Sequence, residues 1–101
     1  MSILYEVNLK VTSSILSEFF SWLRTHVEEM LQFDGFIEAT IYEDISKLDE
    51  IVVSYVIISQ EALQDYFDKH ATQMRDKGLA KFGDQFSAQR RILKMSTKMT
   101  R

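Results

Sequence analysis

The spacing of apolar residues switches between two periods along the chain, and this succession restricts the fold more than any other feature of the sequence. Apolar residues two apart are typical of a strand with one buried face, and apolar residues three or four apart are typical of an amphipathic helix. Read in order, the pattern predicts strands at 3–11, 36–43, 51–58 and 86–93, a helix at 14–32, and a second helix that starts after Ser59. The order of elements is therefore strand, helix, strand, strand, helix, strand.

Two glycines mark the ends of the predicted helices. Gly35 follows the first helix and suits the left-handed conformation in which helices often end. We expect Gly78 to break the second helix, with Leu79–Phe82 as a separate short turn. The strand at 51–58 is apolar on both faces, which favours a central position. With right-handed crossovers, this order predicts a ferredoxin-like α+β fold, a four-stranded antiparallel sheet with both helices on one face.

The chain has the length of one domain. It contains 101 residues, of which 46% are hydrophobic and 27% charged, the proportions of a globular protein. Residues 1–95 form the predicted domain, and the basic segment 96–101, which has no apolar pattern, is expected to fray.

Composition excludes several classes of protein. The absence of cysteine excludes disulfides, thiolate metal sites and thiol nucleophiles, and it fits a cytoplasmic protein. No apolar run approaches the roughly 20 residues of a membrane span, and the N-terminus lacks the pattern of a signal peptide. A sequence pI near 5.3 argues against nucleic-acid binding. No carboxylates are arranged around the two histidines, so we expect no metal site and no cofactor.

Charge is divided unevenly along the chain. Residues 1–68 hold thirteen acidic and three basic side chains, a net charge of −10, whereas residues 69–101 hold nine basic and two acidic side chains, a net charge of +7. One interpretation is a basic site for an anionic ligand. The other is that the basic third pairs with acidic segments of this chain or of a second copy.

One face of the predicted sheet carries no helix. Strand alternation places a mixed set of side chains there: Leu4, Glu6, Asn8, Lys10, Phe36, Thr40, Tyr42, Gln89, Arg91 and Leu93. Glu6 and Arg91 lie on neighbouring strands and are expected to pair. Because a short chain gains stability by burying such a face, we predict a homodimer through it, with solvent exposure as the alternative.

The side chains most suited to chemistry are predicted to converge between the helices and the sheet. Helical spacing puts both histidines on sheet-facing stripes, and strand alternation points Tyr5 and Arg90 toward the helices. The candidate ligand-binding residues are Tyr5, Trp22, His26, Tyr55, His70, Arg75 and Arg90.

These residue types indicate a small-molecule site. A histidine shielded from water is a candidate general base, Arg90 suits a carboxylate or oxyanion, and Trp22 suits a planar ligand. An apolar cleft with a few converging polar groups predicts a small, partly apolar or anionic ligand. The alternative is a structural role, in which the histidines are hydrogen-bonded within the core and Arg90 extends to its edge.

Several short motifs are distributed along nearly the whole chain. They are Tyr5–Asn8 (YEVN), Trp22-Leu23 followed by His26, Met30-Leu31, Gly35-Phe36, His70-Ala71, Met74-Arg75, Gly78-Leu79, Phe82-Gly83 and Arg90–Leu93 (RRIL). Together they resemble a family of bacterial proteins of about this length that is classed as a domain of unknown function. The resemblance implies the fold of that family and carries almost no assigned biochemistry.

The topology is more distantly similar to the dimeric α+β barrel superfamily, which includes cofactor-independent monooxygenases of the antibiotic-biosynthesis type and haem-degrading enzymes. That resemblance implies a cleft between helices and sheet. The haem-degrading branch uses an asparagine, a tryptophan and a histidine, types that Asn8, Trp22 and His70 supply. Alternation points Asn8 to the far face, and the branch carries its tryptophan elsewhere than on the first helix, so the pattern disfavours haem.

The sequence thus predicts an uncharacterised small homodimer with a small-molecule cleft. A cofactor-independent monooxygenase-like enzyme remains an alternative because a desolvated histidine is a candidate base. A non-catalytic dimeric interaction module also remains, because the charge split suits association between copies.

Overall fold

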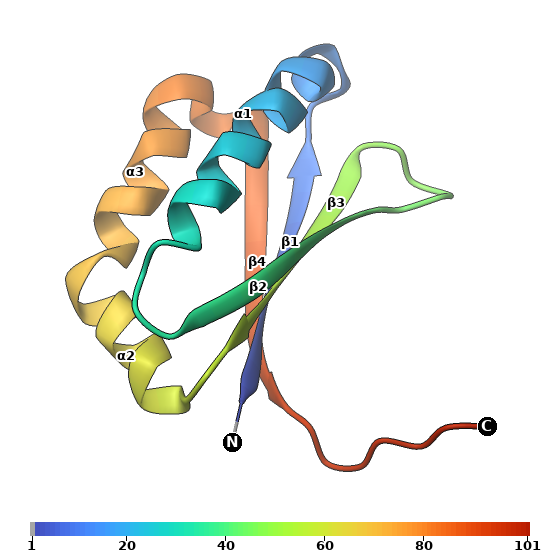
Figure 1. Ribbon diagram of the computed structural model, residues 1–101. Coiled ribbons are helices and arrows are strands. Elements are labelled where there is room, and N and C mark those ends of the chain that lie inside the picture. The colour runs from blue at the N-terminus through green and yellow to red at the C-terminus, as the bar shows by residue number, and fades with distance from the viewer. Residues whose placement is uncertain (1) are drawn as a thin grey trace.

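The structure, a computed structural model, describes residues 2–101 and contains one sheet and one layer of helices. The strands are β1 (Ile3–Val11), β2 (Phe36–Glu43), β3 (Glu50–Ile57) and β4 (Phe86–Lys94). The helices are α1 (Leu16–Met30), α2 (Gln60–Lys69) and α3 (Ala71–Phe82), with single 3-10 turns at Ser13–Ile15 and Gly83–Gln85. Figure 1 shows all three helices over one face of the sheet. The predicted ferredoxin-like α+β fold is therefore confirmed.

The sheet has the strand order β2-β3-β1-β4, and every neighbouring pair is antiparallel. β1 and β3 occupy its centre, as the apolar run at 51–58 predicts. Alternate residues of β3 are buried toward the helices: Ile51, Val53, Tyr55 and Ile57. The residues between them are only half-buried, because no helix among the described residues covers their side of the sheet.

The helix α1 is held on the sheet by one buried stripe, formed by Phe19, Leu23, Val27 and Met30. These positions are three or four residues apart, so they lie on one side of the helix. Each fully buried side chain of this kind contributes about 1.5–3 kcal/mol of transfer free energy. Trp22 and His26 lie beside this stripe and are half-buried.

The second helical region is divided at a different residue from the one expected. The break lies at His70, which has φ −130° and ψ −26° between α2 and α3. Gly78 continues α3, and Leu79–Phe82 is the last turn of that helix, so the prediction of a break at Gly78 was wrong. Gly78 serves close packing: a Cβ there would lie 3.1 Å from Trp22 Cη2 and 3.2 Å from Phe86 Cζ.

The start of β2 also differs from the simple alternation. The register with β3 shifts between Phe36 and Glu38, so Ile37 is an extra residue in β2. As a result Phe36 is 8% exposed and packs in the core, whereas Ile37 is 56% exposed. The prediction that placed Phe36 on the uncovered face was wrong, because strand alternation does not anticipate a bulge.

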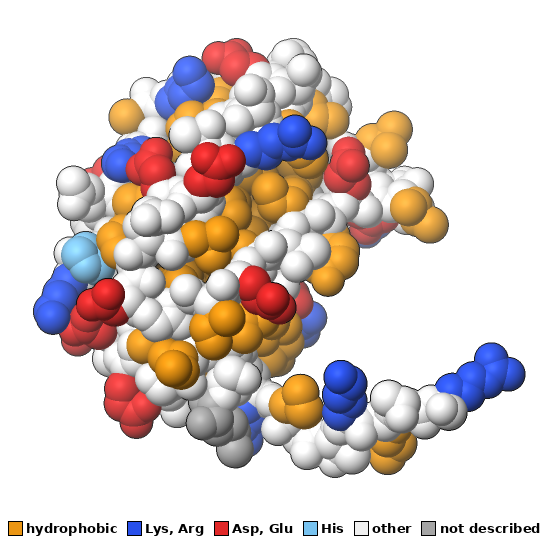
Figure 2. All heavy atoms as spheres, in the orientation of Figure 1, with side chains coloured by type: hydrophobic (Ala, Val, Ile, Leu, Met, Phe, Trp, Pro, Cys, Tyr) orange, Lys and Arg blue, Asp and Glu red, His pale blue; other side chains and the backbone are white. Residues whose placement is uncertain are grey.

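The uncovered face of the sheet and the C-terminal tail lie on the same side of the molecule (Figure 1). Residues 95–101 form neither helix nor strand and are exposed. Figure 2 shows this tail projecting from the body with basic side chains near its end. Within residues 2–101, no helix has the length and hydropathy that a membrane crossing requires.

Candidate functional site

A cavity of about 60 Å³ lies between the helical layer and the sheet. This exceeds the roughly 10–15 Å³ of such space that a single water requires. It is lined by Tyr5, Val7, Leu9, Phe19, Trp22, Leu23, His26, Met30, Val53, Tyr55, Tyr66, Met74, Arg75, Gly78, Phe86 and Arg90. Most of these side chains are apolar or aromatic, and the two arginines are exposed. The cavity therefore has an apolar interior and a cationic outer end.

Trp22 and His26 form a stacked pair at the cavity. They are four residues apart on α1, which puts both on one side of the helix. Their ring centroids are 4.6 Å apart and the ring planes differ by 20°. Trp22 also approaches Gly78 of α3, where a Cβ would lie only 3.1 Å from the indole. The pair is thus held in place by both helices.

The imidazole of His26 has an unusual environment. Its Nδ1 atom is buried and has no hydrogen-bond partner among the described residues. Burial lowers the pKa of His26 below its ordinary value of 6.5, and the charges of Lys77 and Arg90 lower it further. Glu29 acts in the opposite direction. At neutral pH the ring is therefore uncharged, with a ring nitrogen free to accept or donate.

Three tyrosines form the opposite wall of the cavity. The rings of Tyr5 and Tyr55 are stacked with centroids 5.9 Å apart, and Tyr66 lies 6.4 Å from Tyr5. The Tyr66 hydroxyl donates a hydrogen bond of 3.4 Å to Met30 Sδ. Burial raises the pKa of Tyr55, and it raises the pKa of Tyr66 to about 12. The hydroxyls of Tyr55 and Tyr66 are therefore neutral at physiological pH, and they are polar groups in an apolar layer.

The two arginines approach the cavity from different elements. Arg75 lies on α3, where its Nη2 donates to the Tyr5 hydroxyl at 3.4 Å and its guanidinium lies 5.9 Å from the Phe67 ring centre. Arg90 lies on the edge strand β4 opposite Val7 of β1. Strand alternation correctly predicts that Arg90 points toward the helices.

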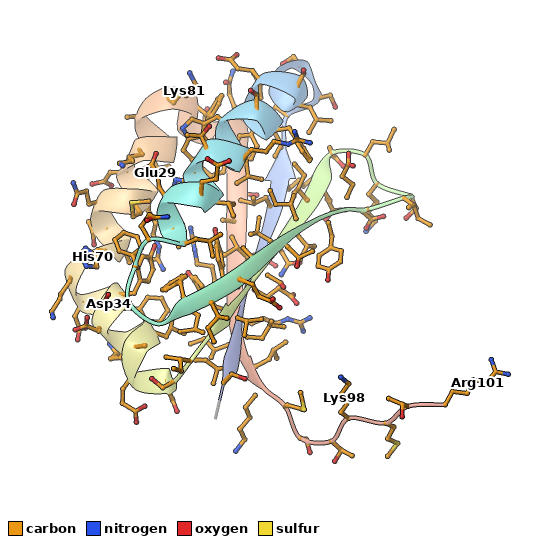
Figure 3. The ribbon with its side chains drawn as sticks, in the orientation of Figure 1. Glu29, Asp34, His70, Lys81, Lys98 and Arg101 are labelled. Atoms are coloured by element: carbon orange, nitrogen blue, oxygen red, sulfur yellow. The ribbon has the colours of Figure 1, made fainter. Side chains whose placement is uncertain are left out.

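The structure brings together six of the seven candidate residues. Tyr5, Trp22, His26, Tyr55, Arg75 and Arg90 all line the cavity. His70 does not line it: the ring stacks on Phe33, with centroids 4.4 Å apart. Figure 3 shows His70 near Asp34 on the outer side of the helical layer, at the junction of α2 and α3. The helix break at His70 takes this residue off the continuous stripe, so the prediction that it faces the sheet was wrong.

Some lining residues were not recognised as part of a site from the sequence. Tyr66 and Gly78 line the cavity but are not among the predicted binding residues, and Gly78 was predicted to break its helix. An isolated glycine in a helical pattern is itself a signal of close packing, since it lowers helix stability by about 1 kcal/mol relative to alanine. Gly78 therefore indicates a close helix contact that the pattern of apolar residues does not predict.

The described residues do not assemble a haem site from the three residue types noted in the sequence. Asn8 lies on the uncovered face and donates to Glu6 Oε1 at 3.0 Å. His70 is outside the cavity, and only Trp22 lines it. In residues 2–101, no cluster of three or more histidine, aspartate or glutamate side chains is placed to hold a metal ion.

Comparison with known proteins identifies the family of the chain and solved structures that share its fold. The family model described as a domain of unknown function, DUF4286, matches residues 2–96. A search of the curated proteins finds no match.

Solved structures with the same fold are similar over nearly the whole chain. A variant of SnoaB, a cofactor-independent oxygenase from Streptomyces nogalater, has a TM-score of 0.80 and 12% identity, covering 99% of this chain and 98% of that one. A putative antibiotic biosynthesis monooxygenase from Deinococcus radiodurans has a TM-score of 0.78 and 13% identity, covering 97% and 96%. Rv0793 from Mycobacterium tuberculosis has a TM-score of 0.74 and 16% identity, covering 99% and 100%. At such identities the likeness shows a common fold alone.

Proposed function

We propose that this chain, which belongs to the DUF4286 family of domains of unknown function, binds a small, partly apolar molecule in the cavity between its helices and its sheet. The six cavity residues Tyr5, Trp22, His26, Tyr55, Arg75 and Arg90 are the proposed binding residues. The observation that carries the proposal is the unpartnered Nδ1 of His26, a residue that lines a cavity with aromatic walls.

A buried polar atom without a partner is costly, and native proteins leave few of them. In this protein the unpartnered atom belongs to His26, one of the residues that line an unfilled space. A ligand hydroxyl at that point supplies the missing hydrogen bond, and Trp22 offers a flat apolar surface beside it. The arrangement has the form of small-molecule sites, which combine an apolar lining with a few polar groups.

The test uses the two histidines of the chain as internal reporters. The probe is 4-methylphenol, which has one apolar ring and one hydroxyl donor. We expect increasing probe to shift the NMR signals of the His26 imidazole and to change the fluorescence of Trp22, the single tryptophan. The signals of His70 are expected to stay unchanged, because that ring lies outside the cavity.

Two variants check where the probe binds. Val7→Phe places a larger side chain in the cavity lining and is expected to abolish the response. Leu79→Phe is the matched control, because Leu79 is 55% exposed on α3 and does not line the cavity. Equal shifts of both histidines, or none in the folded protein, contradict the proposal.

A second candidate is cofactor-independent oxygenation in the same cavity, favoured by the uncharged His26 as a proton acceptor. In that reaction the imidazole removes a proton from an activated methylene group, and O₂ oxidises the carbanion. The methylene becomes a carbonyl, one oxygen atom enters the product and the other leaves as water. An oxygen electrode with 2-indanone as the probe tests this: uptake lost in His26→Phe supports oxygenation, and uptake no faster than in buffer rejects it.

We also propose that two copies of the chain pair through the uncovered face of the sheet. That face carries the half-buried Leu4, Val52 and Val56, together with Tyr42, which is 55% exposed. Glu6 and Arg91 are paired on it, as predicted, with Arg91 Nε 2.8 Å from Glu6 Oε1. Because the two charges are paired within one chain, they oppose burial of the face in a symmetric dimer less than unpaired charges would.

A further inference from the structure

The nine basic side chains of residues 69–101 fall into three groups in the structure. Four form ion pairs, which are Lys69–Asp65, Lys77–Glu29, Lys81–Glu18 and Arg91–Glu6. Three lie at the end of β4 and on the exposed tail: Lys94, Lys98 and Arg101. The remaining two, Arg75 and Arg90, line the cavity. The excess of positive charge in this third is thus partly neutralised within the chain and partly concentrated at one site.

Arg75 and Arg90 have no acidic partner. Among residues 2–101, the ion pairs of the chain do not include either guanidinium. The hydrogen bond of Arg75 goes to a neutral group, the Tyr5 hydroxyl. Guanidinium groups carry a permanent charge and five donors arranged to bind oxyanions. The two side chains therefore keep most of their donors available.

Both guanidinium charges act on the same part of the cavity. The charges of Arg75 and Arg90 each act to lower the pKa of the Tyr66 hydroxyl, because each favours its ionised form. Arg90 has the same effect on Tyr55. The register gives the reason: Arg90 lies opposite Val7, two residues from Tyr5 along the same face of β1, and Arg75 reaches the Tyr5 hydroxyl. Two like charges that line one cavity, with no carboxylate in its lining, form a site that attracts an anion.

The neighbouring walls restrict the rest of the ligand. Tyr5 and Tyr55 are stacked on the sheet side, and Trp22 and His26 are stacked on the helix side. Flat aromatic walls accept a planar apolar group between them. The cavity has no lysine or acidic side chain in its lining, so a second charged group on the ligand finds no partner there.

We infer that the ligand is a small planar organic acid whose single carboxylate is bound by Arg75 and Arg90 and whose apolar ring enters toward Trp22 and His26. This inference rests on the proposed binding function and goes further by naming the chemical class of the ligand.

The experiment compares two probes of equal shape and different charge. These are 4-methylbenzoate, an anion, and 4-methylbenzamide, its neutral counterpart. Binding is measured by Trp22 fluorescence and by the His26 NMR signals. We expect the wild-type protein to bind the benzoate at least tenfold more tightly than the amide. The preference is expected to weaken as salt is added, because the charged contact lies at an exposed opening.

Matched arginine variants locate the charge preference. Arg90→Gln and Arg75→Gln each remove one charge from the cavity and are expected to reduce benzoate binding at least fivefold, with little effect on the amide. Arg91→Gln is the control: it removes the same charge one residue away, on the opposite face of the sheet. Arg90→Lys keeps the charge without the planar fork and is expected to retain part of the preference.

The outcomes separate the two proposals. If both probes bind equally and the His26 signals shift, the cavity binds small molecules but the anion site is wrong. If Arg91→Gln weakens benzoate binding as much as Arg90→Gln, the effect comes from overall charge and the anion site is again wrong. If neither probe nor 4-methylphenol moves the His26 signals, the proposed binding function itself fails. Retained circular dichroism confirms that each variant is folded.

Discussion

At the scale of single residues, His26 distinguishes this chain from one with a purely structural core. Its Nδ1 is the one buried side-chain nitrogen or oxygen of the described residues that has no hydrogen-bond partner. Helical spacing put His26 on the inner side of α1, and the structure adds the stacking on Trp22 and the missing partner. A histidine that serves only for packing can be replaced by phenylalanine with little loss of stability. The effect of His26→Phe on the free energy of unfolding therefore measures the energetic cost of burying the imidazole.

The lowered pKa of His26 predicts a specific pH dependence of stability. Its folded pKa lies below the ordinary 6.5, so the unfolded chain binds the extra proton more readily. Stability therefore rises with pH up to about 6.5 and then levels off. We expect acidification from pH 7 to pH 5 to destabilise the wild type, at no more than about 1.4 kcal/mol per pH unit.

Urea unfolding at several pH values measures this dependence. The range lies above 4.5, the ordinary pKa from which the pKa values of Glu6 and Glu29 are lowered, so these carboxyl groups contribute little to the pH dependence there. His26→Phe is expected to flatten the profile, whereas His70→Gln keeps it. A wild-type profile that is already flat would show that His26 is freely hydrated.

At the scale of elements, the contact between α1 and α3 shapes the cavity. Lys77 Nζ lies 2.6 Å from Glu29 Oε2, and Lys81 Nζ lies 3.6 Å from Glu18 Oε1, so two ion pairs join these helices. Figure 3 shows Glu29 and Lys81 on the two neighbouring helices. Exposed pairs contribute only about 0–1 kcal/mol each. The contact between α1 and α3 is constrained more strongly by packing, because Gly78 lets Trp22 lie against α3.

Gly78→Ala separates helix propensity from this contact. Alanine in place of glycine favours a helix by about 1 kcal/mol, but the new Cβ presses on Trp22 at 3.1 Å and on Phe86 at 3.2 Å. We expect the two effects to offset each other, leaving stability within about 1 kcal/mol of the wild type. Trp22 fluorescence is expected to change, and probe binding to weaken.

Ala80→Gly calibrates the experiment, because Ala80 is exposed on the same helix and reports propensity alone. A gain in Gly78→Ala as large as the loss in Ala80→Gly means that the contact with Trp22 has no energetic consequence.

At the scale of the whole molecule, the two faces of the sheet have different surroundings. The helices cover one face of the sheet (Figure 1). The other face carries the half-buried Val52 and Val56 of β3. A stable interface buries roughly 800 Å² on each partner, and an uncovered four-stranded sheet offers a surface of that kind. The proposed dimer places this face out of water and leaves the cavity on the far side of each sheet.

Val52→Lys tests the dimer. A lysine on the uncovered face opposes its burial, so we expect sedimentation to show a dimer for the wild type and a folded monomer for the variant. Leu79→Lys, on the exposed side of α3, is expected to remain dimeric. Wild-type protein that sediments as a monomer at micromolar concentration rejects the pairing.

Much of the candidate site could be predicted from the sequence, because the direction of a side chain depends on its own helix or strand. The direction of Tyr5 and Arg90 follows from strand alternation, and the shared side of Trp22 and His26 follows from their four-residue spacing. Both rules depend only on the axis of a single element, so they hold wherever the element is regular. His70 and Phe36 were misplaced because a helix break and a bulge interrupt that regularity.

The amino-acid sequence by itself therefore determined the order of the elements, the central strands and the inward direction of most cavity residues, since each follows from hydrophobic periodicity. Only the tertiary structure decided that Gly78 packs against Trp22 and, among residues 2–101, that Nδ1 of His26 has no hydrogen-bond partner and that Arg75 and Arg90 form no ion pair. These facts concern the distance between side chains on different elements. Periodicity fixes where a side chain points from its own backbone, but the space left between two packed elements depends on both surfaces at once.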